Sequence, residues 1–433
     1  MTAPSNTYRS NRFRLLPDRE AERTLRVLGD RVSALWNAAN YRCRQAFLAG
    51  EPVPGYTALS TELRPHETYA ALPSDVALEV LKKLSEAWKG YWELRALWKA
   101  KKLPQKPGLP RYRKHKDGTR PTDSVPVKCA RSRLDAHRFA LTLPADLRQK
   151  AGSRLCLSHR GSARYRGALG RAEVRYDAGR GRWYLHVAVQ TPEPKRKPWE
   201  RAAAIDLGVR CLVSLSVEGE EQALHFLGRE VLKSWDYAGR QIATHMAELS
   251  HRPKAERSSK RLRRLHQRRR ARWTHAWESL ASQVASVCRR RRIGVVYIGW
   301  PKHIRRDTDY SAQWNGRIHN FWSFDRASRI LEKHLGRYGI IAHRVGERGS
   351  SSTCPRCDSI RVVRRPRHRL RCLACGLSIH ADQAGSRNLL KENKPTVTWA
   401  GAEAVPRPDV RRWTRHRWAD ASNPCATPQD LAA

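Results

Sequence analysis

Several features are missing from this sequence of 433 residues. No run of about 18 apolar residues occurs, which excludes a membrane-spanning helix. The N-terminal segment MTAPSNTYRSNRFRLLP lacks the apolar core of a secretory signal, and no internal repeat is evident. We therefore expect a cytosolic protein (nuclear in a eukaryote) with no membrane partner. Its length and its 40% content of hydrophobic residues fit two to four globular domains.

Acidic residues are scarce relative to basic ones. Lys and Arg total 85 against 40 Asp and Glu, which gives a formal net charge of +45. Such an excess repels itself in a folded chain unless a polyanion neutralises it, and nucleic acid is the obvious polyanion. Ribosomal proteins share this bias but are seldom this long or this rich in tryptophan. An anionic membrane surface is disfavoured because no basic amphipathic helix stands isolated.

The first half of the chain resembles a β-barrel interrupted by helices. Strand-like alternation marks residues 8–16 and returns over 125–192, where the segment DAGRGR predicts a hairpin turn. Helical periodicity between these regions predicts one helix from Asp18 and another from near Ser74. A proline-rich linker at 192–200 then separates this half from the second.

Two segments concentrate positive charge. Residues 100–121 hold four prolines and many Lys and Arg, so we expect a basic loop against a phosphate backbone. Residues 252–272 hold eleven basic residues and one acid, and Leu262 and Leu265 offer little apolar surface for burial. A solvated helix is one interpretation, but a helix laid along a duplex is favoured because phosphates supply the counterions. The candidate contacts are Lys260, Arg261, Arg263, Arg264, Arg268, Arg269 and Arg270.

Four of the ten cysteines are clustered in the pattern CxxC-x14-CxxC, namely Cys354, Cys357, Cys372 and Cys375. Two such pairs place four thiolates around Zn²⁺ at about 2.3 Å each. Disulfides are disfavoured in a reducing compartment. Because four cysteines leave no open coordination position, we expect a structural zinc that folds a short ribbon. Gly376, after the second pair, suits a left-handed backbone, whereas Asp358 after the first pair is less usual.

The second half alternates buried strands and amphipathic helices. Residues 202–217 predict two buried strands around a tight turn, and 293–299 predict a central strand. Asp206 ends the first of these strands, and a buried acid needs a metal or a base beside it. Asp382 precedes a short amphipathic helix, where an acid is more often a cap than a ligand. Two-metal phosphodiester cleavage requires acids that converge on ions roughly 3.5–4 Å apart.

These motifs together resemble the TnpB family of transposon-encoded, RNA-guided nucleases, which is related to compact type V CRISPR effectors. The residues that carry the likeness are IDLGV (205–209), SSSTCPRC (350–357) and RCLACGLSIHADQAGSRNLL (371–390). The N-terminal RFRLLPDREAERTL and the segment PGLPRYRKH also fit. The resemblance covers residues 8–391 and is most specific in the C-terminal half.

The resemblance implies an α/β multidomain protein in which a β-barrel wedge domain with a helical recognition insertion precedes a RuvC (ribonuclease-H-like) domain carrying a zinc ribbon. It also implies a guide RNA, a target DNA with a short flanking motif, catalytic Mg²⁺, and a prokaryotic cytoplasm with nucleoid association on DNA. Asp206 and Asp382 take the first and last acidic positions, and Arg387 is a candidate for steering the DNA strand. The implied domains are 1–17 with 122–195 (wedge), 18–121 (insertion), 200–349 with 377–393 (RuvC-like), 350–376 (zinc ribbon) and a basic, tryptophan-containing extension, 394–433, of unassigned role.

One departure from the family pattern concerns the middle acid. Family members carry a Glu at the end of the central strand, where this sequence has Gly299. Glu347, just past the end of the next strand, is a relocated candidate, since neighbouring strands lie about 4.8 Å apart. Asp307, Asp309 and Asp325 are rivals in a loop or at a helix start, and a surface ion pair with Arg344 or Arg348 is the ordinary explanation for Glu347.

Three functions remain open at this point. The first is an RNA-guided DNA endonuclease in which Asp206, Glu347 and Asp382 hold Mg²⁺. The second is a guided DNA-binding protein that no longer cuts and blocks transcription. The third is an RNA-independent transposase of the same fold, which only fold analogy supports. The guide, the flanking motif and the oligomeric state are not predicted.

Overall fold

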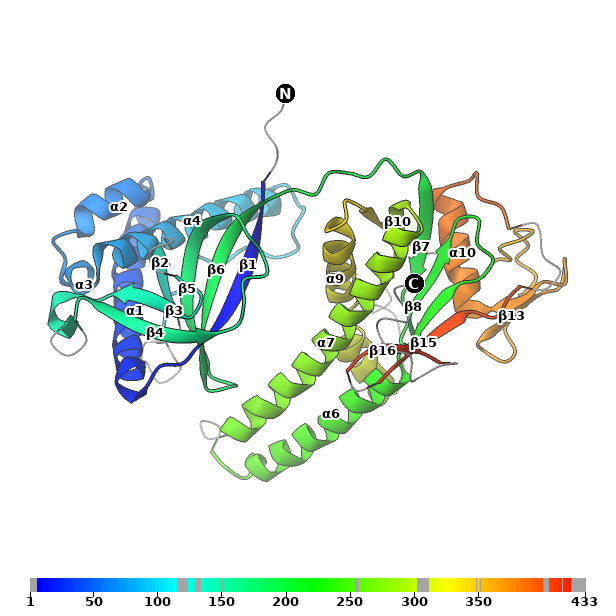
Figure 1. The fold of residues 1–433 in the computed structure, drawn as a ribbon. Coiled ribbons are helices and arrows are strands. Elements are labelled where there is room, and N and C mark those ends of the chain that lie inside the picture. The colour runs from blue at the N-terminus through cyan, green and yellow to red at the C-terminus, as the bar shows by residue number, and fades with distance from the viewer. Residues whose placement is uncertain are drawn as a thin grey trace. The chain divides into compact units, whose positions relative to one another are not determined.

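The computed structural model forms two compact units, Met1–Glu193 and Pro194–Ala433, and their boundary falls inside the predicted linker. It describes residues 6–114, 124–128, 134–148, 152–253, 257–301, 311–347, 349–350, 352–399, 405–414 and 416–421 (Figure 1). No helix in these ranges is long and apolar enough to cross a membrane.

In the first unit, a helical insertion separates one strand from the rest of its sheet. The strands are β1 (Asn6–Leu15), β2 (Ser124–Lys128), β3 (Arg138–Thr142), β4 (Arg154–Arg160), β5 (Ala168–Asp177) and β6 (Arg182–Pro192). The helices are α1 (Arg19–Leu48), α2 (Tyr56–Leu63), α3 (Glu67–Ala70) and α4 (Ser74–Lys99), with the 3₁₀ turn η2 (Ala145–Leu147). All four α-helices lie between β1 and β2 in the chain.

Helix α1 begins where the sequence predicts. The Asp18 side chain accepts a hydrogen bond from the Ala21 N–H, which caps the helix. Its apolar face is fully buried, with Leu25, Leu28 and Val32 all at 0% exposure. Helix α4 starts at Ser74, but the capping residue is Pro73 and no side chain caps this end.

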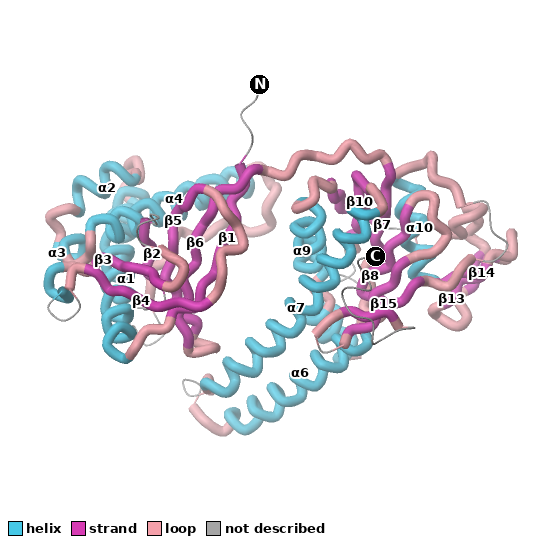
Figure 2. The backbone as a smooth tube through the Cα atoms, viewed as in Figure 1, coloured by secondary structure: helices cyan, strands magenta, loops and turns pink. Residues whose placement is uncertain are grey.

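The six strands form one antiparallel sheet in the order β2-β5-β6-β1-β4-β3 (Figure 2). Strand β1 pairs with β6 along most of its length and with β4 at Arg14 and Leu15, so it links the two halves of the sheet. Among the described residues no ladder joins the outer strands β2 and β3. The closed barrel therefore stays a prediction.

The basic loop after α4 is described up to Lys114, and it has no regular structure. Its backbone is anchored to α1, because the Trp36 indole N–H donates to Arg111 O and the Asn40 amide donates to Pro110 O. The Arg113 guanidinium lies 4.1 Å from the centre of the Trp36 ring. Residues 115–121 of this predicted loop lie outside the described residues.

The second unit contains a seven-stranded sheet, a helical layer and a small three-stranded sheet. Its strands are β7 (Arg201–Asp206), β8 (Cys211–Val217), β9 (Leu224–Leu227), β10 (Ile293–Trp300), β11 (Ile341–Gly346), β12 (Val362–Val363), β13 (Arg369–Cys372), β14 (Ser378–His380), β15 (Asp409–Trp413) and β16 (Trp418–Asp420). Its helices are α6 (Arg229–Ser250), α7 (Lys260–Arg290), α8 (Ala312–Gly316), the π-helix η4 (Arg317–Phe321), α9 (Phe324–Gly336) and α10 (Ala381–Asn393).

The order of the large sheet is β11-β10-β7-β8-β9-β15-β16. Strands β7, β8 and β9 are antiparallel, whereas β10 runs parallel to both β7 and β11. The register pairs Ile298 with Ile205 and Gly299 with Val345. Parallel strands share their carboxyl ends, so Asp206, Gly299 and the residues after β11 meet at one edge of the sheet.

The C-terminal extension, unassigned from sequence, completes this sheet. Strand β15 pairs in parallel with β9, and β16 pairs with β15. Trp418 is fully buried, and its indole N–H donates to Ala276 O on α7 at 2.9 Å. Trp399 packs with Leu389 and Ala204 in a second cluster. These residues are part of the core of the second unit.

Replacing Trp418 should therefore destabilise the second unit. Trp418→Ala removes a fully buried indole, and such truncations cost about 3–5 kcal/mol. Thermal unfolding followed by calorimetry should show a lower midpoint, whereas Tyr41→Ala, at a 58% exposed position, should leave it nearly unchanged. Equal midpoints for Trp418→Ala and the parent protein would contradict a core role for the extension.

Candidate active site and metal centre

Asp206 ends β7 and lies under helix α10. A Cβ atom built on Gly385 of α10 would stand 2.8 Å from Asp206 Oδ2, closer than real Cβ contacts allow. The missing side chain of Gly385 thus provides the space that the Asp206 carboxylate occupies. Sequence reasoning missed this residue, although a glycine within a short amphipathic helix is a signal of close approach.

Glu347 follows β11 and lies over Gly299. A Cβ atom built on Gly299 would stand 2.9 Å from Glu347 Oε2, and 3.3 Å from Ile205 O on β7. The Glu347 carboxylate therefore fills the space that a side chain at position 299 would enter. Its Oε2 atom is buried and accepts no hydrogen bond from the described residues. A buried carboxylate oxygen without a donor is costly unless it is protonated or binds a cation.

Two of the alternatives for the middle acid involve residues that the structure describes. Arg344 pairs with Glu332 and Asp325, so its guanidinium is engaged away from Glu347. Asp325 also pairs with Arg329, which explains that carboxylate as part of an exposed ion-pair network. Asp307, Asp309 and Arg348 lie outside the described residues.

Hydrogen bonds from α10 fix the loop that begins at Glu347. The Ser350 hydroxyl donates to Glu347 O at 2.9 Å, and the Asn388 amide donates to Ser350 O at 2.6 Å. The same amide donates to Thr353 O at 2.9 Å. Asn388 therefore connects the helix of Asp382 to the loop of Glu347, and it is a positioning residue that the sequence pattern did not reveal.

Asp382 stands in the first turn of α10, directly after β14. The backbone N–H of Asp382 donates to His380 Nδ1 at 3.3 Å, and His380 Nδ1 lies 3.8 Å from the Asp382 carboxylate. The helix is thus capped by His380, and the Asp382 carboxylate remains available to a ligand. Its side chain keeps 40% exposure.

Electrostatics link the three carboxylates. Burial and, to a smaller extent, the carboxylates of Asp382 and Glu347 together raise the pKa of Asp206 to about 8, against the opposing effect of Arg364. Burial alone raises the pKa of Glu347 to about 7. Burial also raises the pKa of Asp382, while His380, Arg364, His368 and Arg210 oppose the shift. An acid whose pKa is raised by burial and by two neighbouring carboxylates is typical of a site that binds a divalent cation.

The carboxylates are nevertheless not drawn into one tight cluster. Among the described residues, the only group of three or more potential ligands whose ligand atoms all lie within 4.8 Å of one another is the set of four cysteines.

The raised pKa of Asp206 predicts a pH-dependent stability. Because its pKa is higher in the folded protein than in the unfolded chain, ionisation favours unfolding as pH rises from about 4 to about 8. Asp206→Asn removes this penalty. In Mg²⁺-free buffer its stabilisation over the parent should grow by about 3 kcal/mol between pH of about 5.5 and 8.5, as measured by urea unfolding. Asp325→Asn, in an exposed ion pair, is the control, and a pH-independent gain for Asp206→Asn would contradict the prediction.

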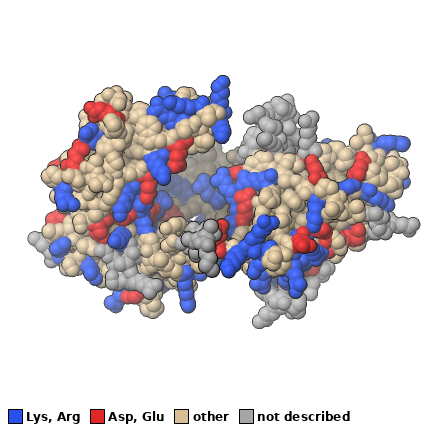
Figure 3. All heavy atoms as spheres, turned by 90° about the horizontal axis from the view of Figure 1, so that it is seen from above, with Lys and Arg blue, Asp and Glu red and all other residues tan. Residues whose placement is uncertain are grey.

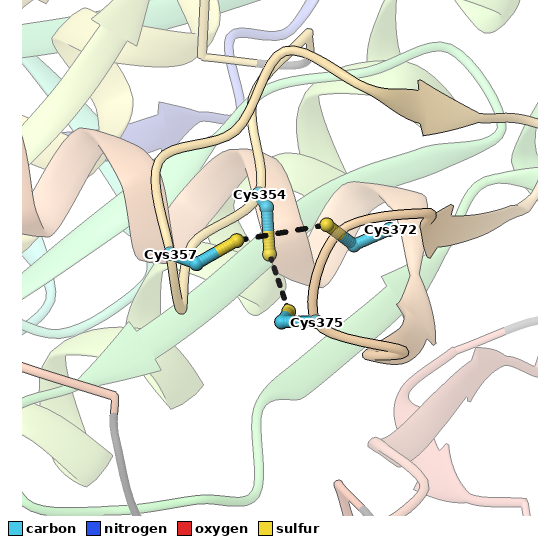
Figure 4. Close-up of side chains that lie close together, drawn as sticks. All are labelled: Cys354, Cys357, Cys372 and Cys375. Atoms are coloured by element: carbon cyan, nitrogen blue, oxygen red, sulfur yellow. Dashed lines mark hydrogen bonds between the residues drawn. The ribbon is translucent and has the colours of Figure 1, made fainter.

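The four cysteines converge on one point (Figure 4). Cys354 Sγ lies 3.6 Å from Cys375 Sγ, and Cys357 Sγ lies 3.6 Å from Cys372 Sγ. A disulfide would bring two sulfurs to about 2.0 Å, whereas a tetrahedron with Zn–S bonds of about 2.3 Å separates them by about 3.8 Å. The arrangement fits Zn²⁺ with four thiolates, as the spacing predicts.

Backbone geometry agrees with paired metal-binding turns. Burial raises the pKa of Cys372, but the N–H groups of Cys375 and Ala374 outweigh it and lower the pKa to about 7. Gly376 and Asp358 both adopt left-handed conformations, with φ of 75° and 58°. Asp358 is held by Lys391 Nζ at 2.7 Å, which ties the first turn to α10.

The ribbon shares its core with helix α10. Leu370, Leu377 and Ile379 of the ribbon pack with Cys354, Cys372 and Ala384 of α10. Strand β14 ends at His380, and α10 begins at the next residue. The four-cysteine centre therefore fixes the position from which Asp382 projects.

The structure corrects one predicted nucleic-acid contact. Arg387 is only 1% exposed, and its guanidinium donates to Glu221 Oε2 at 2.5 Å and to Glu221 O at 2.6 Å. It also lies 4.4 Å from the centre of the Trp399 ring. Arg387 is thus a buried structural cation, and it cannot steer a strand. Arg364, Arg210 and His368 lie near the carboxylates and replace it as candidates.

The predicted basic residues of 260–270 lie on helix α7. The side chains of Lys260, Arg261, Arg263, Arg264, Arg268 and Arg270 are exposed. Arg269 is half-buried, with its guanidinium 4.4 Å from the centre of the Trp235 ring. On the face shown in Figure 3, patches of Lys and Arg occur over both units.

Comparisons with known proteins find matches to two family models and to a viral protein. The family model described as a probable transposase (OrfB_IS605) matches residues 184–305, and the Cas12f1-like TNB domain matches residues 324–389. A TnpB-like protein, ORF457 of Acidianus two-tailed virus, is 26% identical over 416 residues, covering 89% of this chain and 86% of that protein. The chain is thus similar to a TnpB-like protein over most of its length, and parts of it match the transposase and Cas12f1-like family models.

A solved structure has a similar fold. The Cas12f1 chain of a Cas12f1–sgRNA–target DNA complex superposes with a TM-score of 0.57 at 14% identity, covering 85% of this chain and 82% of that chain. The two family models together span β6 to β10 and then α9 to α10. They include Asp206, Gly299, Glu347, Asp382 and all four cysteines.

Proposed function

We propose that this chain is a member of the TnpB family and an RNA-guided DNA endonuclease with a RuvC-like site formed by Asp206, Glu347 and Asp382. The observation that carries the proposal is the Glu347 carboxylate, which lies over Gly299 with a buried oxygen that has no hydrogen-bond donor. The acid missing from the central strand is thus supplied by the neighbouring strand. The order β9-β8-β7-β10-β11, with its antiparallel and parallel halves, supports a ribonuclease-H-like domain.

The donor set fits Mg²⁺, which prefers carboxylate oxygens. When bound, Mg²⁺ would activate water and stabilise the leaving oxygen of a phosphodiester. The protein's own contribution is to hold three acids from β7, the β11 loop and α10 at one sheet edge. Gly385 leaves room for the Asp206 carboxylate and Gly299 for that of Glu347, and Asn388 fixes the loop of Glu347 to α10. Arg364 and Arg210 stand where they can neutralise a DNA phosphate.

A guide RNA and a target DNA are the proposed partners. Guide pairing would read the target, and the basic surfaces would grip the backbone of the heteroduplex. The net charge of +45 supports a polyanionic partner in permanent association. We further propose a wedge domain with a helical recognition insertion for the first unit, a zinc ribbon for residues 350–376, and a prokaryotic cytoplasmic location.

The test combines the purified protein, RNA that co-purifies from its host, and a DNA library containing the matching target. Cleavage that requires both RNA and Mg²⁺ supports the proposal. Cleavage without RNA would favour an RNA-independent transposase. The glycine at position 299 favours one second candidate, a guided DNA-binding protein that does not cut. RNA-dependent DNA binding without cleavage in Mg²⁺ would select that function.

A further inference from the structure

A groove runs along the seam between α6 and α7, far in sequence from the carboxylates. These two helices pack side by side in the second unit (Figure 1). One part of the groove has a volume of about 790 Å³, and the next part has about 590 Å³. Tyr237, which is 52% exposed, lines both parts.

Positive charge lines the first part. Arg261, Arg264 and Arg268 of α7 follow one another at helical spacing on a single face, and Arg240 of α6 stands opposite. Within the described part of the chain, no carboxylate lies within 4.0 Å of Arg261, Arg264 or Arg268. The one acid of this part, Glu248, is held by His245 at 2.6 Å.

Aromatic rings line the second part. The helical face of α7 continues through Arg272 to His275, and β15 contributes Trp413. The rings of His275 and Trp413 lie 5.4 Å apart, and Trp413 rests on the buried Trp418 at 5.3 Å. The C-terminal extension, which neither family model includes, therefore builds a rigid ring platform at one end of the charged track.

We propose that this groove binds a single-stranded segment of nucleic acid, with phosphates along Arg261, Arg264 and Arg268 and unpaired bases against Tyr237 and Trp413. The inference rests on the proposed function, which supplies the nucleic acid. It adds a binding site for a single-stranded segment of that nucleic acid. From Arg261 to His275 the face extends about 21 Å, enough for several nucleotides. Exposed rings beside a cationic track are the chemistry of single-strand binding, because paired bases cannot stack on side chains.

The first experiment compares matched arginine pairs of α7. The full-length protein in Mg²⁺-free buffer is titrated with fluorescein-labelled oligo-dT, oligo-U and a DNA duplex of equal length. Arg264→Gln with Arg268→Gln removes two groove charges and should lower the salt dependence of oligo-dT or oligo-U binding by about 1.4. Arg263→Gln with Arg270→Gln removes two charges that do not line the groove, and it should change binding less. Equal effects of the two pairs would overturn the proposal, as would tighter binding of the duplex.

The second experiment tests stacking. Tyr237→Ala should weaken single-strand binding by about 5- to 100-fold, and Tyr237→Phe, which keeps the ring, should retain it. Identical affinities for both variants and the parent would overturn stacking at this site. A preference for oligo-dT identifies a strand of the target DNA as the ligand, and a preference for oligo-U identifies the guide; either supports the groove. Because cleavage is not measured, an inactive carboxylate site leaves these results unaffected.

Discussion

Glu347→Gln should abolish DNA cleavage while it leaves RNA-dependent DNA binding intact. The substitution keeps the size of the side chain but removes the negative charge that a divalent cation needs. Since the carboxylate is buried over Gly299, its neutral replacement also removes an unpaired buried charge, so the variant should be at least as stable as the parent above pH of about 7. Cleavage of a guide-matched plasmid and gel-shift binding are the two measurements.

Three further variants make this test more specific. Glu332→Gln changes a glutamate in an exposed ion pair with Arg344, and it should retain cleavage. Gly299→Glu should be inactive by itself, because its Cβ would stand 2.9 Å from Glu347 Oε2. Gly299→Glu combined with Glu347→Gly returns the acid to the central strand and should restore part of the activity. Full cleavage by Glu347→Gln would contradict the relocated acid.

Cys372→Ser should abolish both metal content and cleavage. Structural Zn²⁺ in small domains contributes about 10–16 kcal/mol of apparent binding free energy, so a ribbon that loses one of its four thiolates should unfold locally. Because the ribbon shares its core with Ala384 of α10, we expect Asp382 to lose its position. Elemental analysis should show about one zinc per chain in the parent and little in the variant, and thermal unfolding should begin at a lower temperature.

Cys156→Ser is the matched control for this prediction. Cys156 is exposed on β4 and outside the cluster, so its replacement should preserve zinc, stability and cleavage. A Cys372→Ser protein that still cleaved guide-matched DNA at the parent rate would show that the ribbon does not position Asp382.

Local sequence patterns determined much of the fold. The apolar periodicity from Asp18 matches α1, whose predicted face is buried, and the segment DAGRGR lies at the β5–β6 turn. The segment IGVVYIG matches β10, which lies between β7 and β11 in the sheet. These elements are readable because burial of one face imposes a period of 3.6 or 2 on the sequence.

The residues of the candidate site differ in how much of their role the sequence could predict. The four-cysteine centre is evident from spacing, because two short turns are sufficient to place each pair of sulfurs. Arg387 was misassigned because an arginine near a nucleic-acid motif looks the same whether it is exposed or paired internally with Glu221. The contributions of Asn388 and Trp418 depend on neighbours distant in the chain, and no local pattern encodes them, whereas the glycine at position 385 of a short helix is a local signal of close approach.

The sequence by itself determined the charge, the cysteine centre, the buried strands and the acids at their ends, because each depends on residue type and short-range spacing. Only the tertiary structure decided that Glu347 lies over Gly299, that Arg387 is internal, and that the C-terminal extension adds β15 and β16 to the sheet. Strand order and side-chain packing decide these relations, since they bring together residues tens or hundreds of positions apart.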